Sequence, residues 1–141
     1  MRIQRRGDNA HDWRLYHGQG SVGVEWYFKE TTRLACSVML YRLDPGAEEG
    51  QHFHLDGDAG SCTPNSSDEI YVVTSGEVVM TSGDDRAVLR SGDSLYAPAG
   101  TLHGVRNESS EPAELVLIFG PPGSHPRPQT GTESFGLSAL S

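Results

Sequence analysis

The stretch that decides the fold is residues 46–54, which read Gly-Ala-Glu-Glu-Gly-Gln-His-Phe-His. His52 and His54 are two residues apart, so on a β-strand, where side chains alternate between faces, both imidazoles point to the same side. Two imidazoles on one side can share one ligand. A carboxylate further along, Glu69, and a third imidazole, His103, would complete a set of nitrogen and oxygen donors suited to a first-row transition metal.

The rest of the chain has the pattern of an all-β protein. Gly and Pro recur at short intervals, and the segments between them are short and rich in Val, Ile, Leu, Tyr and Phe. Strands of this length at such regular spacing indicate a sandwich or barrel. Besides the strand that carries His52 and His54, we expect strands at residues 22–28, 34–43, 69–74, 77–81, 86–90, 94–97, 103–107 and 113–119. The domain organisation that follows is an N-terminal arm (1–21), one barrel (22–120) and a Pro-rich tail (121–141).

Two spacings resemble the signature motifs of the cupin superfamily. The first is Gly46-x5-His52-x-His54-x14-Glu69-x6-Gly76, and the second is Gly92-x5-Pro98-x-Gly100-x2-His103-x3-Asn107. Every named position of the two family motifs is matched, over roughly residues 34–120. The departure is the gap between His54 and Glu69, which is about ten residues longer than is usual in the family. The polar, turn-rich residues 55–68 fill this gap, and we expect a loop there that acts as a lid over the site.

The resemblance implies a cupin double-stranded β-helix, or jelly-roll, barrel with one bound metal ion. The ligands that it implies are His52, His54, Glu69 and His103, with Glu69 ionised by the cation. Imidazole and carboxylate donors admit several divalent transition metals, of which iron is preferred here and manganese, nickel, zinc and copper remain open. Four protein ligands leave about two positions of an octahedral ion for a substrate, water or dioxygen, which suits catalysis.

Among reactions, the resemblance favours a dioxygenase-like oxidoreductase that acts on a small organic substrate. One alternative is a zinc- or nickel-dependent cyclase or isomerase, because residues 119–128 loosely resemble the ending of cupins that act as aromatic polyketide cyclases. Another is a cupin that binds a small ligand without catalysis. The sequence nominates no general base. Tyr71 and Tyr96 lie on strands beside the ligands, and we interpret both as packing residues.

Three further residues of the motif regions are interpreted as structural. Glu48 and Glu49 are expected to be solvated turn residues, and Asn107 is expected to cap a turn rather than to touch the metal.

The charge of the chain excludes some partners. A formal net charge of -8 and a pI near 5.1 argue against a nucleic acid or an anionic membrane, since both reward a basic face. No run approaches the roughly 20 apolar residues of a membrane helix, and no secretory signal is recognisable. We therefore expect a cytoplasmic protein. Because the strand edges of a small barrel need covering, we also expect a homodimer.

Overall fold

The computed structural model describes residues 1–53 and 68–120. Within these ranges the chain forms ten β-strands and no helix, which confirms the all-β prediction. The strands are β1 (Ala10–Trp13), β2 (Val22–Trp26), β3 (Ser37–Leu43), β4 (Glu48–His52), β5 (Asp68–Ser75), β6 (Glu77–Ser82), β7 (Asp85–Arg90), β8 (Ser94–Ala97), β9 (His103–Arg106) and β10 (Ala113–Gly120). His54, the greater part of the expected 55–68 loop and the 121–141 tail lie outside the described residues.

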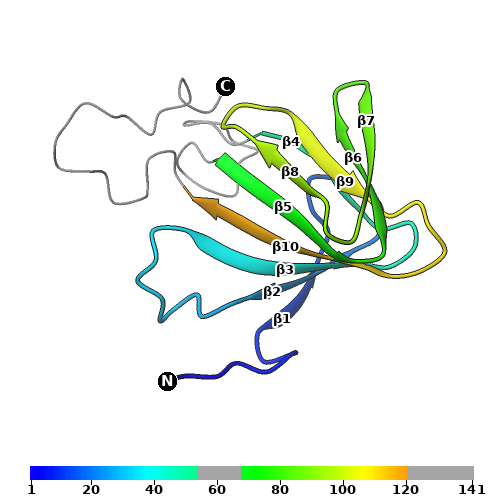
Figure 1. The fold of residues 1–141 in the computed structure, drawn as a ribbon. Helices are drawn as coiled ribbons and strands as arrows, with labels where there is room; N and C mark the ends of the chain where they lie inside the picture. The colour runs from blue at the N-terminus through cyan, green and yellow to red at the C-terminus, as the bar shows by residue number, and fades with distance from the viewer. Residues whose placement is uncertain (54–67, 121–141) are drawn as a thin grey trace, which may run out of the picture.

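The strands form two antiparallel sheets (Figure 1). The six-stranded sheet has the order β1-β2-β3-β10-β5-β8, and the four-stranded sheet has the order β4-β9-β6-β7. Neighbouring strands come from distant parts of the sequence, because β10 lies between β3 and β5 and β9 lies between β4 and β6. Since no helix of the described residues is long and apolar enough to cross a membrane, none of them is a candidate membrane span.

Alternation along the strands builds the core between the sheets. In β10 the odd-numbered residues Ala113, Leu115, Leu117 and Phe119 are buried, and the residues between them are only half-buried. Strands β2, β3, β5, β6 and β9 add further buried side chains to the same cluster. Each fully buried side chain of this size contributes about 1.5–3 kcal/mol of hydrophobic stabilisation.

Three expected boundaries differ from the structure by two or more residues. The strand expected over 34–43 begins only at Ser37. Inside the expected N-terminal arm, Ala10–Trp13 forms β1, which pairs with β2 and extends the six-stranded sheet. The strand expected over 22–28 ends at Trp26, because Phe28 has a φ of +52° and starts a turn instead. A left-handed φ is incompatible with a continuing strand.

One end of the barrel is closed around Asn107, whose side chain is fully buried. Its Nδ2 donates to the carbonyl oxygens of Leu43 (2.9 Å) and Glu111 (2.7 Å), and its Oδ1 accepts from Ser109. The Asn107 backbone also exchanges hydrogen bonds with Gly46 and Ala47 at the start of β4. The expectation that Asn107 is a turn cap is therefore confirmed.

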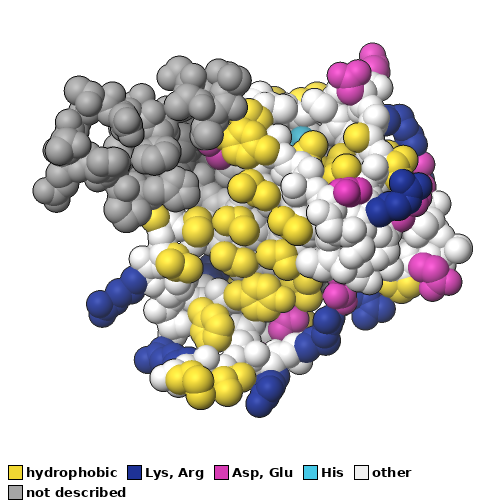
Figure 2. Space-filling view, in the orientation of Figure 1, with side chains coloured by type: hydrophobic (Ala, Val, Ile, Leu, Met, Phe, Trp, Pro, Cys, Tyr) yellow, Lys and Arg dark blue, Asp and Glu magenta, His cyan; other side chains and the backbone are white. Residues whose placement is uncertain are grey.

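The outer face of the six-stranded sheet is apolar. Figure 2 shows hydrophobic side chains gathered over this part of the surface. In register across four strands lie Tyr96, Ile70, Ile118 and Val38, of which Ile70 and Tyr96 are more than a third exposed.

Candidate metal centre

A β-bulge in β4 turns two functional side chains to the same side. Glu49 pairs with Val105 and His52 pairs with His103, so three steps along β4 match two steps along β9. In a regular strand, residues three apart point to opposite faces. The extra residue, within Gly50–Gln51, reverses the alternation, so that Glu49 and His52 are both buried while Gln51 is exposed.

Glu49 is therefore not the solvated turn residue that the sequence suggested: its exposed fraction is 1%. The Tyr71 hydroxyl donates a 2.7 Å hydrogen bond to its Oε1, whereas its Oε2 has no hydrogen-bond partner among the described residues. Burial, followed by the negative charge of Glu69, raises the pKa of Glu49 from its ordinary 4.5 to about 8. Glu49 is thus a protonated acid at neutral pH unless a cation lies beside it.

His103 and Glu69 meet in the interior. His103 begins β9 and Glu69 lies in β5, and the exposed fraction of each side chain is 5% or less. His103 Nε2 lies 2.9 Å from Glu69 Oε2. Burial lowers the pKa of His103, but the hydrogen bond and the charge of Glu69 outweigh burial and raise it.

The backbone orients both imidazoles. His52 Nδ1 lies 2.8 Å from the Gly50 carbonyl oxygen, and His103 Nδ1 lies 2.7 Å from the Thr101 carbonyl oxygen. A carbonyl oxygen can only accept, so each Nδ1 carries the hydrogen and Nε2 becomes the atom that can donate a lone pair to a metal. Such contacts fix the tautomer and ring orientation in histidine metal sites.

These side chains fit a transition metal. Ligand atoms of Glu49, His52 and His103 lie within 4.8 Å of one another, and all three residues are buried. Glu69, which contacts His103, adds a second carboxylate. An unpartnered buried carboxylate oxygen is costly unless it meets a cation, and two imidazoles with carboxylate oxygen make a suitable donor set. Of the four expected ligands, the structure brings His52, Glu69 and His103 together, and His54 lies outside the described residues.

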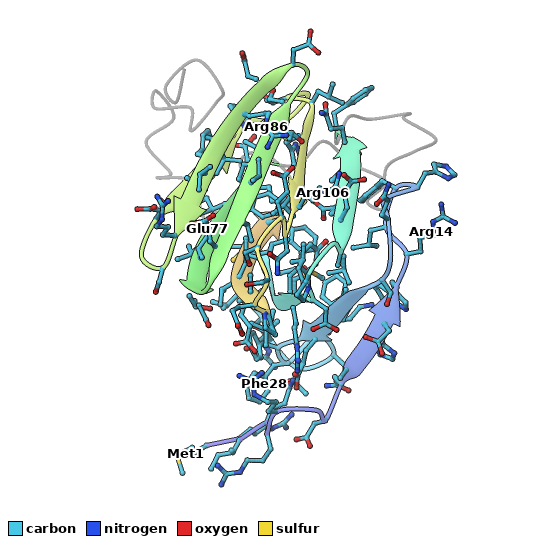
Figure 3. The ribbon with its side chains drawn as sticks, turned by 90° about the vertical axis from the view of Figure 1, so that its right-hand side faces the viewer. Met1, Arg14, Phe28, Glu77, Arg86 and Arg106 are labelled. Carbon is cyan, nitrogen blue, oxygen red and sulfur yellow. The ribbon has the colours of Figure 1, made fainter. Side chains whose placement is uncertain are left out.

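A segment that precedes β2 supports His52 from one side. Residues 14–19, which we call the crossing segment, run along β4, with Leu15 bridging to Glu49 and hydrogen bonds joining Gly50 N to Leu15 O (3.1 Å) and Glu48 N to Gln19 O (2.9 Å). Figure 3 labels Arg14, where this segment begins, on the side where β4 lies. Tyr16 stacks on His52 with ring centroids 3.6 Å apart and planes inclined by 7°. Tyr16 has a φ of +51°, so the surrounding contacts impose this placement.

A cavity of about 420 Å³ opens beside the donor set. His52 and Glu69 form one end, and β2, β3 and β10 supply apolar walls. Its volume lies within the roughly 300–1,000 Å³ that is typical of ligand pockets. A small molecule in this cavity would therefore touch His52 and Glu69, two of the residues that could hold a metal.

Comparison with known proteins agrees with the fold and the motifs. Residues 39–119 match the model of the cupin domain family Cupin_2, and the chain belongs to this family. The uncharacterized protein SCO3923 of Streptomyces coelicolor is 33% identical over 88 residues, which make up 62% of this chain and 72% of that protein.

Solved structures share the barrel. A structure described as a predicted oxalate decarboxylase from Thermotoga maritima superposes with a TM-score of 0.70 at 20% identity, over 84% of this chain and 97% of that one. A structure described as a sugar phosphate isomerase of the cupin superfamily from Silicibacter pomeroyi gives 0.58 at 22% identity, over 70% and 59%. At these identities the likeness establishes the cupin barrel and leaves the reaction open.

Sequence reasoning missed Glu49 and Tyr16. Glu49 could have been found only from Gly50, since a glycine inside a strand often marks a bulge. Tyr16 lies in no motif, and its approach to His52 depends on the crossing segment.

Proposed function

We propose that the protein is a metal-dependent enzyme that acts on a small organic molecule, with dioxygenase-like chemistry favoured. The observation that carries this proposal is the buried group of Glu49, His52 and His103, with Glu69 beside it, at one end of a cavity of ligand size. The metal would be held by His52, His103, Glu69 and, outside the described residues, His54. Iron is the preferred ion, and manganese, nickel, zinc or copper would suit the same donors.

The protein's own groups prepare the site for this chemistry. Tyr16 keeps the His52 ring in place, and the carbonyls of Gly50 and Thr101 keep hydrogen on Nδ1 of the two imidazoles. The apolar walls exclude water, which strengthens the electrostatic interactions inside the cavity. The ion, when bound, would supply dioxygen activation if it is iron, manganese or copper, and polarisation of a carbonyl oxygen if it is zinc or nickel.

A second candidate is a cyclase or isomerase, and Glu49 favours it. Without a cation beside it, burial and the charge of Glu69 raise the pKa of Glu49 to about 8, and its Oε1 accepts a hydrogen bond from Tyr71. Glu49 does not line the cavity itself, but its carboxyl group lies near His52, which does, and an acid with a pKa of about 8 can exchange a proton through such a neighbour, which suits isomerisation without a redox step. The fold-level likeness to a sugar phosphate isomerase is compatible with this candidate, although apolar cavity walls suit a less polar substrate.

Elemental analysis combined with oxygen uptake tests the proposal. Protein from its own host is expected to hold about one divalent transition metal per chain and to consume oxygen with a substrate from a panel of small aromatic and aliphatic acids. Protein that holds only zinc and is inert to oxygen would exclude the dioxygenase and leave the isomerase. A His103→Ala variant should lose the metal, and a variant that keeps its full content would refute the ligand set. Protein without any metal would indicate a non-catalytic binder.

The partners and location stay proposals. We propose a homodimer formed through the apolar outer row of Tyr96, Ile70, Ile118 and Val38, because a second copy would cover this row by twofold symmetry. A cytoplasmic location and the absence of nucleic-acid and membrane partners remain predictions from the composition.

A further inference from the structure

The wall of the cavity beside the metal centre combines polar and apolar side chains. Its inner end carries His52 and Glu69, and its middle is lined by aromatic and aliphatic side chains that include Trp26, Met39 and Phe119. Trp26 and Phe119 contact each other at a centroid distance of 5.6 Å with an interplanar angle of 60°. Aromatic walls of this kind favour a flat ring as the ligand, because rings pack face-on or edge-on against one another.

A single ammonium group stands at the outer end of this cavity. Lys29 lines the cavity, and its Nζ lies 4.5 Å from the centre of the Trp26 ring. It is the only lysine in the chain, and no arginine lines this cavity among the described residues. Lys29 also borders an outer groove of about 670 Å³ that contains Arg2, Asp8 and Glu30, so the charges of that groove largely offset one another. Inside the cavity, Lys29 is the group that an anion would meet.

The backbone holds Lys29 in this position. The preceding residue, Phe28, has a φ of +52°, which costs roughly 1–2 kcal/mol for a residue other than glycine. Its N–H donates to Gln4 Oε1 (2.9 Å), and its carbonyl accepts from Thr31 N (3.0 Å) and Thr32 N (2.9 Å). Figure 3 shows Phe28 near the N-terminal arm, at the opposite end of the molecule from Arg86. The turn is therefore fixed by contacts on both sides, which places the backbone of the exposed Lys29 beside the cavity that its side chain lines.

We propose that the cavity binds a flat aromatic carboxylic acid. The ring lies against Trp26, Met39 and Phe119, the carboxylate pairs with Lys29, and the other end of the molecule reaches His52 and Glu69. This inference rests on the proposed function, since it makes the metal centre the place where the bound acid would react. It also explains why a chain with a net charge of -8 keeps its one lysine at the mouth of this cavity.

Binding of trans-cinnamate, compared with its neutral isostere trans-cinnamamide, tests the proposal. Affinities are measured by calorimetry on metal-free protein, so that a metal ion does not attract the carboxylate. Wild-type protein should bind cinnamate about fivefold more tightly than cinnamamide, which is the difference expected from a partly exposed ion pair. Lys29→Met keeps the aliphatic stem over Trp26 and should abolish this preference, while Lys29→Arg should retain it. Arg33→Met, which removes an exposed positive charge that does not line the cavity, is the matched control and should bind as wild type does.

A second readout follows the ammonium group itself. Reductive methylation with ¹³C-formaldehyde keeps the charge and labels Lys29 together with the chain's amino terminus, because no other lysine is present. The Lys29 methyl signal should shift on addition of cinnamate and much less with cinnamamide. The proposal is overturned if wild-type protein does not bind cinnamate at millimolar concentration, or if Lys29→Met binds it as tightly as Arg33→Met. Neither result bears on the metal content. If the protein binds cinnamate but holds no metal when isolated from its host, the proposed metal-dependent function is refuted and the ligand proposal stands.

Discussion

Replacing Gly50 by alanine tests whether the crossing segment holds the metal centre together. A Cβ at position 50 would lie 2.0 Å from the Tyr16 carbonyl oxygen and 2.9 Å from its carbonyl carbon. Both atoms belong to backbone, so the crossing segment must move away from β4 by about 1 Å or more. The movement weakens the hydrogen bonds that Gly50 N makes to Leu15 O and Glu48 N makes to Gln19 O, worth about 1 kcal/mol each.

With a further 1–3 kcal/mol or so for the steric clash, Gly50→Ala should destabilise the protein by about 3–5 kcal/mol. For a chain of this size, that lowers the melting temperature by roughly 10–15 °C. Thermal unfolding is measured in the presence of a chelator, so that metal loss does not contribute. The metal affinity, measured separately, should also fall, because Tyr16 would no longer stack on His52.

Gly83→Ala is the matched control for this prediction. Gly83 has a φ of +60° and no atom within 4 Å of an added Cβ, so alanine there costs only about 1–2 kcal/mol of backbone strain. If Gly50→Ala melts within about 3 °C of Gly83→Ala and binds metal equally well, the crossing segment has no part in supporting the site.

Three further predictions test the interior and the outer face. In metal-free protein the pKa of Glu49 is about 8 against an ordinary 4.5, so the folded state holds a proton that the unfolded state releases. The free energy of unfolding should therefore fall by about 2–4 kcal/mol as pH rises from 5 to 8.5. Denaturant titrations should show a smaller fall for Glu49→Gln. Asn107→Asp removes the buried amide group that donates to two carbonyl oxygens, so the free energy of unfolding should fall by about 2–4 kcal/mol in the same assay, with metal affinity unchanged. A variant as stable as wild type would contradict the role of Asn107 as a turn cap. Light scattering should show that Ile118→Lys is a monomer, because the charge lies in the proposed dimer interface. The control Val88→Lys, on the exposed strand β7, should stay a dimer. A monomeric wild-type protein would refute the proposed interface.

The sequence was sufficient for the barrel because its information is local and periodic. Turn residues bound each strand, and in β10 every second residue faces the core, so both class and strand positions follow from spacing. The same logic failed at β1, whose residues Ala10–Trp13 are all exposed and carry no alternating signal. Pairing with β2, a tertiary contact, makes that segment a strand.

The candidate site was predictable only where strand geometry is regular. The motif spacing indicated His52, Glu69 and His103; in the structure the centroids of the His52 and His103 rings lie 4.4 Å apart and His103 contacts Glu69, while their role as metal ligands stays a prediction. Glu49 was expected to be a solvated turn residue, but it lies in β4. Simple alternation would place it opposite His52, and the bulge at Gly50–Gln51 brings it to the same side. Position 50, within the bulge, has no room for a side chain, because the Tyr16 carbonyl oxygen of the crossing segment lies where its Cβ would be.

The placement of Asn107 has a consequence for protein engineering. Glu48 pairs with Arg106 and His52 pairs with His103, so the hydrogen bonds around Asn107 and the candidate metal ligands lie at opposite ends of one strand pair. One end holds the Asn107 hydrogen bonds, and the other holds the candidate metal ligands. A library that randomises His52 and its neighbours at the cavity while keeping the Asn107 end and the core residues of the cavity wall constant would leave the hydrogen bonds that close the other end of the barrel in place.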